Sequence, residues 1–296
     1  MYVKDGQSAM TLGEWLCIWI DTYKKPNLRP NSLRNLEQMI RLHAPCWLKE
    51  KPLTAVTALD IDRALAQIQG GRTRQYERQT LHAAFGKALK LGLVSRNVVE
   101  MSEAVRYQKQ HGKALSARER HEFLRAIEGT RVKFLMLFYL YTGVRRAEAL
   151  SLAWSDIDET EALIFIHGTK TEDSERAIPL SDVLQNILFE QHRQNEMDKI
   201  RKGRGKFHEA KEGLVFPFSA GYVSRAFKAL CPAHHLHDLR HTYITLCAES
   251  GVNVRVCQQL VGHSTAKMTL DVYTHVMDAY KRKEAAKFSL FPVFEG

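Results

Sequence analysis

Apolar residues recur at helical spacing through most of this chain, and this pattern restricts it to a mainly helical fold. The segment TLGEWLCIWIDTYKK (11–25) opens with a capping box, Thr11 and Glu14, and its apolar residues then fall on one helical face. Similar spacing recurs at 31–43, 58–68 and 74–91. The pattern predicts a compact helical bundle with basic loops over residues 1–100.

The second part of the chain continues this periodicity with one interruption. Ser116 and Glu119 form another capping box, and a strongly apolar helix is predicted at 131–141. The runs ALIFIHG (162–168) and RAIPL (176–180) predict two strands joined by the polar turn TKTEDSE. Further helices are predicted near 182–198, 221–230, 238–250, 253–260 and 265–280. We therefore expect a mainly α fold with a small antiparallel β-sheet in the second domain.

The length of the chain favours two domains. It has 296 residues, about twice a typical domain. The segment MSEAVRYQKQHGK (101–113) is polar and has no periodicity, as expected of a linker. We expect a helical domain over 1–102, a linker over 103–113 and a second domain over 114–296.

Positive charge dominates the chain, and it is unevenly distributed. The formal net charge is +10 and the pI about 9.4, which favours a polyanionic partner, either nucleic acid or an acidic membrane surface. Lys and Arg outnumber Asp and Glu by 17 to 10 over residues 1–110 but only by 26 to 23 over 111–296. The first segment therefore resembles a binding module more than the second does.

Cysteine spacing and hydropathy exclude several classes of protein. The five cysteines include no CxxC pair, so we expect neither a zinc nor a disulfide framework, which suits a reducing cytosol. The N-terminus lacks the apolar run of a signal peptide, and the longest apolar run, FLMLFYLY (134–141), is too short to span a bilayer. These features predict a cytoplasmic protein with no membrane partner.

Histidines crowd the stretch HHLHDLRHTY (234–243). His237 and Arg240 are three apart and share one helical face, whereas His237 and His241 have the spacing of a helical metal pair. A metal site needs a third ligand, and nothing like an HExxH arrangement occurs, so we predict no metal site. A polar helix start explains Asp238, near the positive end of the helix, but not His237 together with Arg240.

Further residues that are able to take part in binding or catalysis lie at the ends of predicted elements. Arg145 and Glu148 are three apart in TGVRRAEAL, at a helix start, and Lys170 lies in the turn between the predicted strands. In VGHSTAKMTLDVYTH, His263 follows the end of one helix and Tyr273 comes ten residues later. Each residue alone is ordinary at such a position.

The chemistry emerges when these residues are taken together. Two arginines can grip the non-bridging oxygens of a phosphate in forked geometry and offset charge in a transition state. A tyrosine oxygen can attack phosphorus if a base takes its proton. Two arginines, two histidines, a lysine and a tyrosine thus predict an anion-binding centre with a nucleophile.

The motifs TGVRRAEAL, the Lys170 turn, HDLRH, VGH and DVYTH resemble, in the same order, the signature of the tyrosine recombinase (phage integrase) family. The resemblance covers about residues 113–280, and the first 100 residues are more loosely similar to the family's core-type DNA-binding domain. Val144 and Val261 stand where the family often has leucine, and both are apolar exchanges that preserve packing.

The resemblance implies a role for each matching residue. Arg145 and Arg240 would clamp the scissile phosphate, with a further hydrogen bond from His263. Tyr273 would attack, which gives a 3′-phosphotyrosyl link and a free 5′-hydroxyl.

The resemblance assigns the remaining residues to proton transfer and orientation. Lys170 would protonate the leaving 5′-oxygen, His237 would act as acid and base near the nucleophile, and Glu148 would orient its neighbours. Because the covalent link conserves the energy of the phosphodiester, no ATP, metal or other cofactor is required, and the chain contains no P-loop pattern.

The leading hypothesis is a site-specific DNA recombinase, either an integrase/excisionase of a mobile element or a dimer-resolving enzyme. It implies double-stranded DNA as partner, a homotetramer in the synaptic complex, a free monomer, and an accessory directionality factor as a further candidate partner. Such a protein would be nucleoid-associated through DNA. A type IB-like topoisomerase and a catalytically silent DNA-binding regulator on the same fold are the alternatives.

Two other segments carry expectations about binding. The basic loop 199–211, with Lys202, Arg204 and Lys206, could follow the DNA backbone, although a solvated surface loop fits equally well. The tail 281–296 has five apolar residues between 288 and 294. We expect it to dock on a neighbouring subunit in the tetramer, with docking on its own domain as the alternative.

Overall fold

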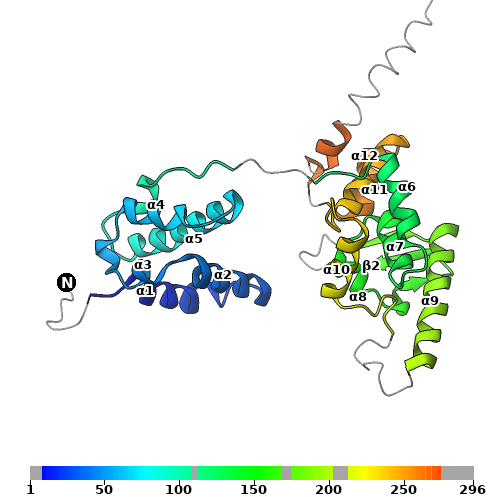
Figure 1. The fold of residues 1–296 in the computed structure, drawn as a ribbon, viewed down its shortest axis with the longest axis horizontal. Coiled ribbons are helices and arrows are strands. Elements are labelled where there is room, and N and C mark those ends of the chain that lie inside the picture. The colour runs from blue at the N-terminus through cyan, green and yellow to red at the C-terminus, as the bar shows by residue number, and fades with distance from the viewer. Residues whose placement is uncertain are drawn as a thin grey trace, which may run out of the picture. The chain divides into compact units, whose positions relative to one another are not determined.

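The computed structural model describes residues 9–107, 112–168, 175–202, 213–263, 265–267 and 269–274. The chain divides into two compact units, an N-terminal unit (1–110) and a C-terminal unit (111–296) (Figure 1). The division falls inside the segment 103–113 that the sequence predicts as a linker. The described residues are mostly helical and include one small antiparallel sheet, so the predicted fold class is confirmed.

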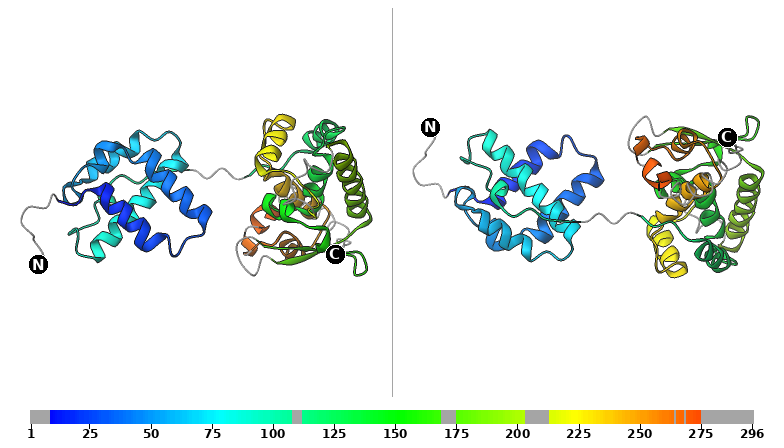
Figure 2. Two further views of the ribbon diagram at one scale, coloured as in Figure 1. Left: turned by 90° about the horizontal axis from the view of Figure 1, so that it is seen from below. Right: turned by 90° about the horizontal axis from the view of Figure 1, so that it is seen from above.

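The N-terminal unit is a helical bundle (Figure 2). Thr11 and Glu14 form the predicted capping box at its first helix, where the Glu14 backbone N–H donates to Thr11 Oγ1 at 3.2 Å. Trp15 Nε1 donates to the Ala84 carbonyl oxygen at 3.1 Å, and this hydrogen bond joins the first helix of this unit to the longest helix of the same unit. The elements are α1 (Leu12–Trp19) with a π-helical turn (Ile20–Lys24), α2 (Pro30–His43), α3 (Cys46–Lys49), α4 (Ala58–Ala66) and α5 (Gly71–Lys90), with 3-10 turns at Leu53–Ala55 and Val98–Met101.

A carboxyl group lies inside this bundle. Glu77 of α5 is only 1% exposed, and among the described residues neither of its carboxylate oxygens has a hydrogen-bond partner. Burial raises the pKa of Glu77 to about 7, against a smaller lowering by the charge of Lys49. Glu77 therefore opposes folding of this unit in its ionised form.

We expect this group to make the stability of the N-terminal unit depend on pH. Because folding raises the pKa of Glu77, protonation of this group favours the folded state. This contribution to stability is fully present below the unfolded pKa of 4.5 and is lost as pH rises through about 7. Glu77→Gln should match the wild type near pH 4.5 and exceed its free energy of unfolding at pH 8 by on the order of 3 kcal/mol. Denaturant titrations on a Trp154→Phe background measure this, since the other tryptophans, Trp15, Trp19 and Trp47, lie in this unit. If the free energy of unfolding of both proteins changed with pH in the same way, the pKa of Glu77 would not be raised by folding.

The C-terminal unit surrounds a three-stranded sheet of order β1-β2-β3 with helices. The two predicted strands pair antiparallel, with Leu163 opposite Pro179 and Ile166 opposite Arg176. The first strand, two residues long, was not predicted. The elements are α6 (Ala117–Ile127), α7 (Lys133–Thr142), α8 (Arg146–Ser151), a 3-10 turn (Trp154–Asp156), β1 (Ile157–Asp158), β2 (Leu163–Ile166), β3 (Arg176–Pro179), α9 (Asp182–Lys202), α10 (Ala220–Leu230), α11 (Asp238–Glu249) and α12 (Val254–Val261).

Helix α7 forms the centre of this unit. Its apolar residues are buried on several sides, and it contacts both α9 and α11, between which it lies in Figure 1. No helix among the described residues has the length and apolar character needed to cross a membrane.

Two glycines end helices next to the residues of interest. Gly143 caps α7 with φ 62° and Gly262 caps α12 with φ 65°. This left-handed conformation is strained for residues with a Cβ, and it turns the chain sharply out of each helix. The first turn leads to Arg145 and the second leads to His263.

Candidate active site

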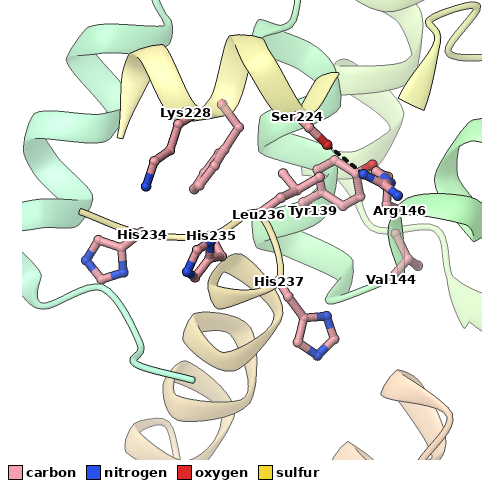
Figure 3. Close-up of a pocket in the computed structure, with 10 residues that line it drawn as sticks. Tyr139, Val144, Arg146, Ser224, Lys228, His234, His235, Leu236 and His237 are labelled. Atoms are coloured by element: carbon pink, nitrogen blue, oxygen red, sulfur yellow. Dashed lines mark hydrogen bonds between the residues drawn. The ribbon is translucent and has the colours of Figure 1, made fainter. Parts of the chain in front are cut away.

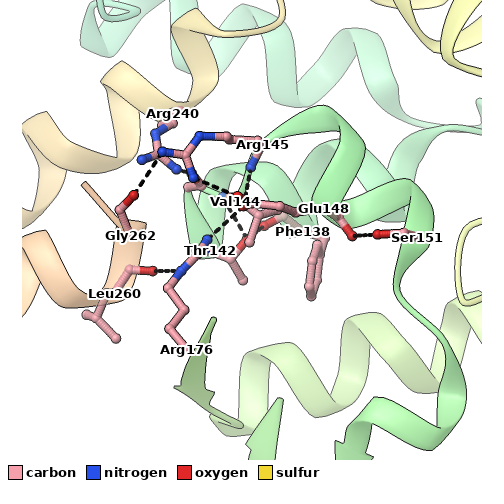
Figure 4. A network of polar contacts seen from close by, with 11 residues as sticks. Phe138, Thr142, Val144, Arg145, Glu148, Ser151, Arg176, Arg240, Leu260 and Gly262 are labelled. Carbon is pink, nitrogen blue, oxygen red and sulfur yellow. Dashed lines mark hydrogen bonds and ion pairs between the residues drawn. The ribbon is translucent and has the colours of Figure 1, made fainter. Parts of the chain in front are cut away.

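Arg145 is held at the start of α8 by the carboxylate of Glu148. Its Nη1 donates to Glu148 Oε1 at 2.6 Å, and its backbone N–H donates to Glu148 Oε2 at 2.8 Å. Its Nη2 donates to the Gly262 carbonyl oxygen at 2.8 Å (Figure 4). Arg145 thus joins the N-terminus of α8 to the end of α12, and its side chain is still 30% exposed.

Glu148 itself is buried, and it is shared by two arginines. Arg176 from β3 donates through Nη2 to Glu148 Oε2 at 2.8 Å (Figure 4). Burial raises the pKa of Glu148, but the hydrogen bonds and charge of Arg176, with those of Arg145, outweigh burial and leave the pKa lowered. The carboxylate therefore stays ionised between the two guanidinium groups.

Arg240 lies in the first turn of α11 and is only 2% exposed. Its Nη1 donates to the Gly143 carbonyl oxygen at 2.8 Å, while its buried Nη2 has no hydrogen-bond partner among the described residues. Burial, followed by the positive charge of Arg145, lowers the pKa of Arg240 to about 9. The group is still a cation at neutral pH, and a buried donor without a partner beside a second guanidinium favours binding of an anion.

His237 and His263 lie near this pair of arginines, and the positive charge of the arginines acts on both imidazoles. Burial, then the neighbouring His241 and Arg240, lowers the pKa of His237 to about 4. Burial, then Arg240 and Arg145, lowers the pKa of His263 to about 3. Both imidazoles are therefore neutral at pH 7 in the absence of a bound anion. The Nδ1 of His263 also lies 2.9 Å from Thr269 Oγ1, which orients the ring.

The other histidines of the 234–241 stretch have different environments. His234 is buried, with Nδ1 3.2 Å from Asp238 Oδ2 and Nε2 3.2 Å from Glu119 Oε1, so it fastens the start of α11 to α6. The His241 ring meets His237 edge to face at 5.2 Å. Among the described residues no group of three or more His, Cys, Asp and Glu side chains is placed to hold a metal ion.

A cavity of about 470 Å³ opens between α7, α8, α10 and the segment 234–237 that precedes α11 (Figure 3). Arg146 lines it and donates through Nη1 to Ser224 Oγ at 2.6 Å, which joins α8 to α10. Lys228, His235 and His237 also line the cavity, together with the apolar side chains of Val144, Phe227 and Leu236, so its surface is part polar and part apolar.

Tyr273 is not placed beside the arginines. It is 6% exposed, and its hydroxyl donates to the Val252 carbonyl oxygen at 3.0 Å. Val252 follows the C-terminal end of α11, and the last residue of that helix, Glu249, lies about 13 Å from Arg240 along the helix axis. Burial, followed by a hydrogen bond with the Cys257 thiol, raises the pKa of Tyr273 above its usual value. At neutral pH the phenol is therefore protonated and bound at the end of α11.

Several predicted residues fall outside the part of the chain that the structure describes. Lys170 lies within 169–174, Arg204 and Lys206 lie within 203–212, and the tail 281–296 follows the last described residue. Lys202 ends α9, but its side chain is not described. Their roles stay predictions.

The sequence interpretation missed Arg176, which it treated as the first residue of a strand. Its side chain is 7% exposed and reaches Glu148. The available signal was its place at the end of the turn that carries Lys170, where a buried arginine needs an anionic partner.

Fold and site together define an anion-binding centre with two arginines and two histidines on a mostly helical domain. A model described as "Phage integrase family" matches residues 107–279, and one described as "Phage integrase, N-terminal SAM-like domain" matches residues 11–67. The chain belongs to the phage integrase family.

Curated relatives agree with this assignment. A XerC-like tyrosine recombinase of Caldanaerobacter subterraneus subsp. tengcongensis is 29% identical in an alignment 189 positions long that covers 53% of this chain and 48% of that protein. An integrase of Streptomyces ambofaciens is 27% identical in an alignment 306 positions long, gaps included, that covers 90% of this chain and 75% of that protein. The match thus spans about half the length of the first relative.

Solved structures share the fold. A lambda integrase dimer bound to a COC′ core site superposes with a TM-score of 0.72 at 22% identity, covering 90% of this chain and 78% of that one. The Tn1549 transposon integrase in complex with a circular intermediate DNA gives 0.73 at 20% identity, covering 95% and 100%.

Proposed function

We propose that this protein is a site-specific DNA recombinase of the integrase/excisionase type that cuts and rejoins DNA through a 3′-phosphotyrosyl intermediate. The observation that carries the proposal is the pair Arg145 and Arg240, two neighbouring guanidinium groups, of which Arg240 has one buried donor without a hydrogen-bond partner among the described residues. A scissile phosphate placed there would accept forked hydrogen bonds that strengthen as charge develops on its oxygens.

The remaining residues have proposed roles around that phosphate. His263 donates a further hydrogen bond to the phosphate, and His237 acts as acid and base near the nucleophile. Both are neutral before DNA binds, and a phosphate anion offsets the arginine charges that lower the pKa of each. Lys170 protonates the 5′-oxygen, and Glu148 orients Arg145. The phosphotyrosyl bond conserves the energy of the phosphodiester, so the proposed reaction uses neither ATP nor a metal.

Attack requires that Tyr273 leave its contact with Val252. Tyr273 is held there by this hydrogen bond, a second one with the Cys257 thiol and apolar packing, and a single hydrogen bond contributes about 1 kcal/mol. We propose that assembly on DNA provides the displacement, with the tail 281–296 docking on a neighbouring subunit and the free protein monomeric. A lambda integrase tetramer bound to a Holliday junction is among the similar structures, which supports a tetrameric synaptic complex.

The N-terminal unit is proposed to bind the DNA that flanks the cleavage site. The excess of positive charge over 1–110 and the match to the family's N-terminal domain support this role. Basic residues 202, 204 and 206 are proposed to contact the phosphate backbone, and an accessory directionality factor is a further proposed partner. The relatives' names include both integrases and Xer recombinases, so integration, excision and dimer resolution are all open to this site.

A covalent trap tests the proposed function. The protein first selects its target from a randomised duplex library, and the selected sequence is then built into substrates with a nick beside each candidate scissile phosphate. We expect a protein–DNA adduct through a 3′-phosphate, a free 5′-hydroxyl, and unchanged yield in EDTA. A two-site assay on the same sequence should give exchanged strands, whereas relaxation alone would identify a topoisomerase. Tight binding with no adduct on any nicked substrate would identify a silent regulator.

A further inference from the structure

Arg176 connects three elements that surround the arginine pair. From β3, its Nη2 donates to Glu148 Oε2 at 2.8 Å and its Nε donates to the Leu260 carbonyl oxygen, near the end of α12, at 2.7 Å. Glu148 in turn binds Arg145, and Arg145 binds the Gly262 carbonyl oxygen. The contacts therefore form a closed ring through α8, β3 and the end of α12 (Figure 4).

The ring is tightly packed at Arg176. Its side chain is 7% exposed, and a Cβ added at Gly262 would lie 2.8 Å from Nη1, so the Gly262 backbone rests directly on the guanidinium group. His263, the next residue, leaves the helix from this point. The positions of Arg145 and of the His263 backbone therefore both depend on the buried side chain of Arg176.

The fork of an arginine is needed for this arrangement. One nitrogen meets the carboxylate and another meets a carbonyl oxygen from a different element, which a single ammonium group cannot do in the same geometry. Both carboxylate oxygens of Glu148 already accept hydrogen bonds. Oε1 accepts from the Arg145 side chain, and Oε2 accepts from the Arg145 backbone N–H and from Arg176.

We propose that Arg176 is a positioning residue for DNA cleavage, which sets the geometry of Arg145 and His263 toward the scissile phosphate without contacting it. This inference rests on the proposed function. It assigns a third arginine to the reaction, one that works through Glu148 and the end of α12.

The experiment compares two substrates in single-turnover cleavage. In the second, a methyl group replaces one non-bridging oxygen of the scissile phosphate, so the phosphorus centre carries no negative charge and depends less on a cationic clamp. We expect Arg176→Gln to slow cleavage of the normal phosphate roughly tenfold to a hundredfold, the scale of a small displacement in an active site. On the methylphosphonate the defect should shrink to within a few-fold. DNA affinity should stay unchanged on both substrates.

Three further variants complete the test. Arg145→Ala is the positive control, since direct loss of the clamp must also be relieved by the methylphosphonate. Arg176→Lys keeps the charge but not both contacts, so it should retain most of the defect. Arg131→Gln removes an arginine that pairs with Asp198 in the same unit, and it should cleave normally.

The outcomes separate the two proposals. No cleavage by the wild type would sink the proposed function itself. Relief of Arg145→Ala without relief of Arg176→Gln, or normal cleavage by Arg176→Lys, would overturn only the positioning role. The thermal midpoint of each variant is measured beside its rate, and Arg176→Lys provides the test if Arg176→Gln does not fold.

Discussion

Tyr273→Phe is expected to retain DNA binding and to lose covalent attachment to DNA. The substitution removes one hydroxyl, whose hydrogen bond to the Val252 carbonyl oxygen contributes about 1 kcal/mol, and the ring still fills the same apolar cluster. Cleavage should fall by roughly 10⁴-fold or more, as losses of nucleophiles do in other enzymes. The measurement is adduct yield on a nicked substrate, followed by digestion and mapping of the modified peptide.

Tyr243→Phe is the matched control for this prediction. Tyr243 packs against the same cluster, and burial raises the pKa of its phenol above the usual value as it does for Tyr273. It lies on α11, where its ring packs against Gly143 and its hydroxyl shares a hydrogen bond with the Cys247 thiol. Tyr243→Phe should therefore form the adduct at the wild-type rate. An adduct mapped to Tyr243, Tyr222 or another tyrosine would remove Tyr273 from the proposed role.

Arg240→Ala is expected to have the second largest effect. It removes the more deeply buried of the two guanidinium groups, and with it the donor that has no partner among the described residues. Loss of one preorganised donor to a developing negative charge costs roughly 10²–10³-fold in rate. Arg240→Lys should recover only part of this, because lysine keeps the charge and loses the fork. Single-turnover cleavage and DNA affinity, measured together, separate an effect on chemistry from one on binding.

The control for Arg240 is an arginine whose loss changes the net charge alone. Arg193 lies on α9 with a 69% exposed side chain and pairs with Glu190, one turn earlier in the same helix. Arg193→Ala should cleave at the wild-type rate. Full cleavage by Arg240→Ala, or an equal defect in Arg193→Ala, would mean that the phosphate is held elsewhere.

Local patterns in the sequence predicted most of the secondary structure. Capping boxes at Thr11 and Ser116 involve residues three apart, and helical periodicity involves residues three or four apart, so both are visible in a short window. The hairpin of β2 and β3 was visible for the same reason, since its strands are close in the chain. Strand β1 was missed because two residues carry no periodicity, and its pairing with β2 alone defines it.

The motifs also pointed to the arginines and histidines of the site, and the structure brings Arg145, Arg240, His237 and His263 together. The sequence singled out His237 through the family resemblance, but it gave no sign of the part that His234 plays, because spacing alone does not show whether a ring faces an ion pair. His234 anchors α11 through Glu119, a residue 115 positions away. Such a contact has no signature in a local window.

The sequence by itself determined the helices, the hairpin and the identity of the arginines and histidines that the structure brings together, because these depend on neighbours within a few positions. Tertiary structure alone decided the partners of Glu148 and Arg176 and the contact of Tyr273 with Val252. Arg145 meets the carbonyl of Gly262 across 117 positions, and Arg176 meets that of Leu260 across 84. These contacts form only when α8, β3 and α12 have packed on the core, since burial raises the cost of an unpaired charge and thereby selects the partner that satisfies it.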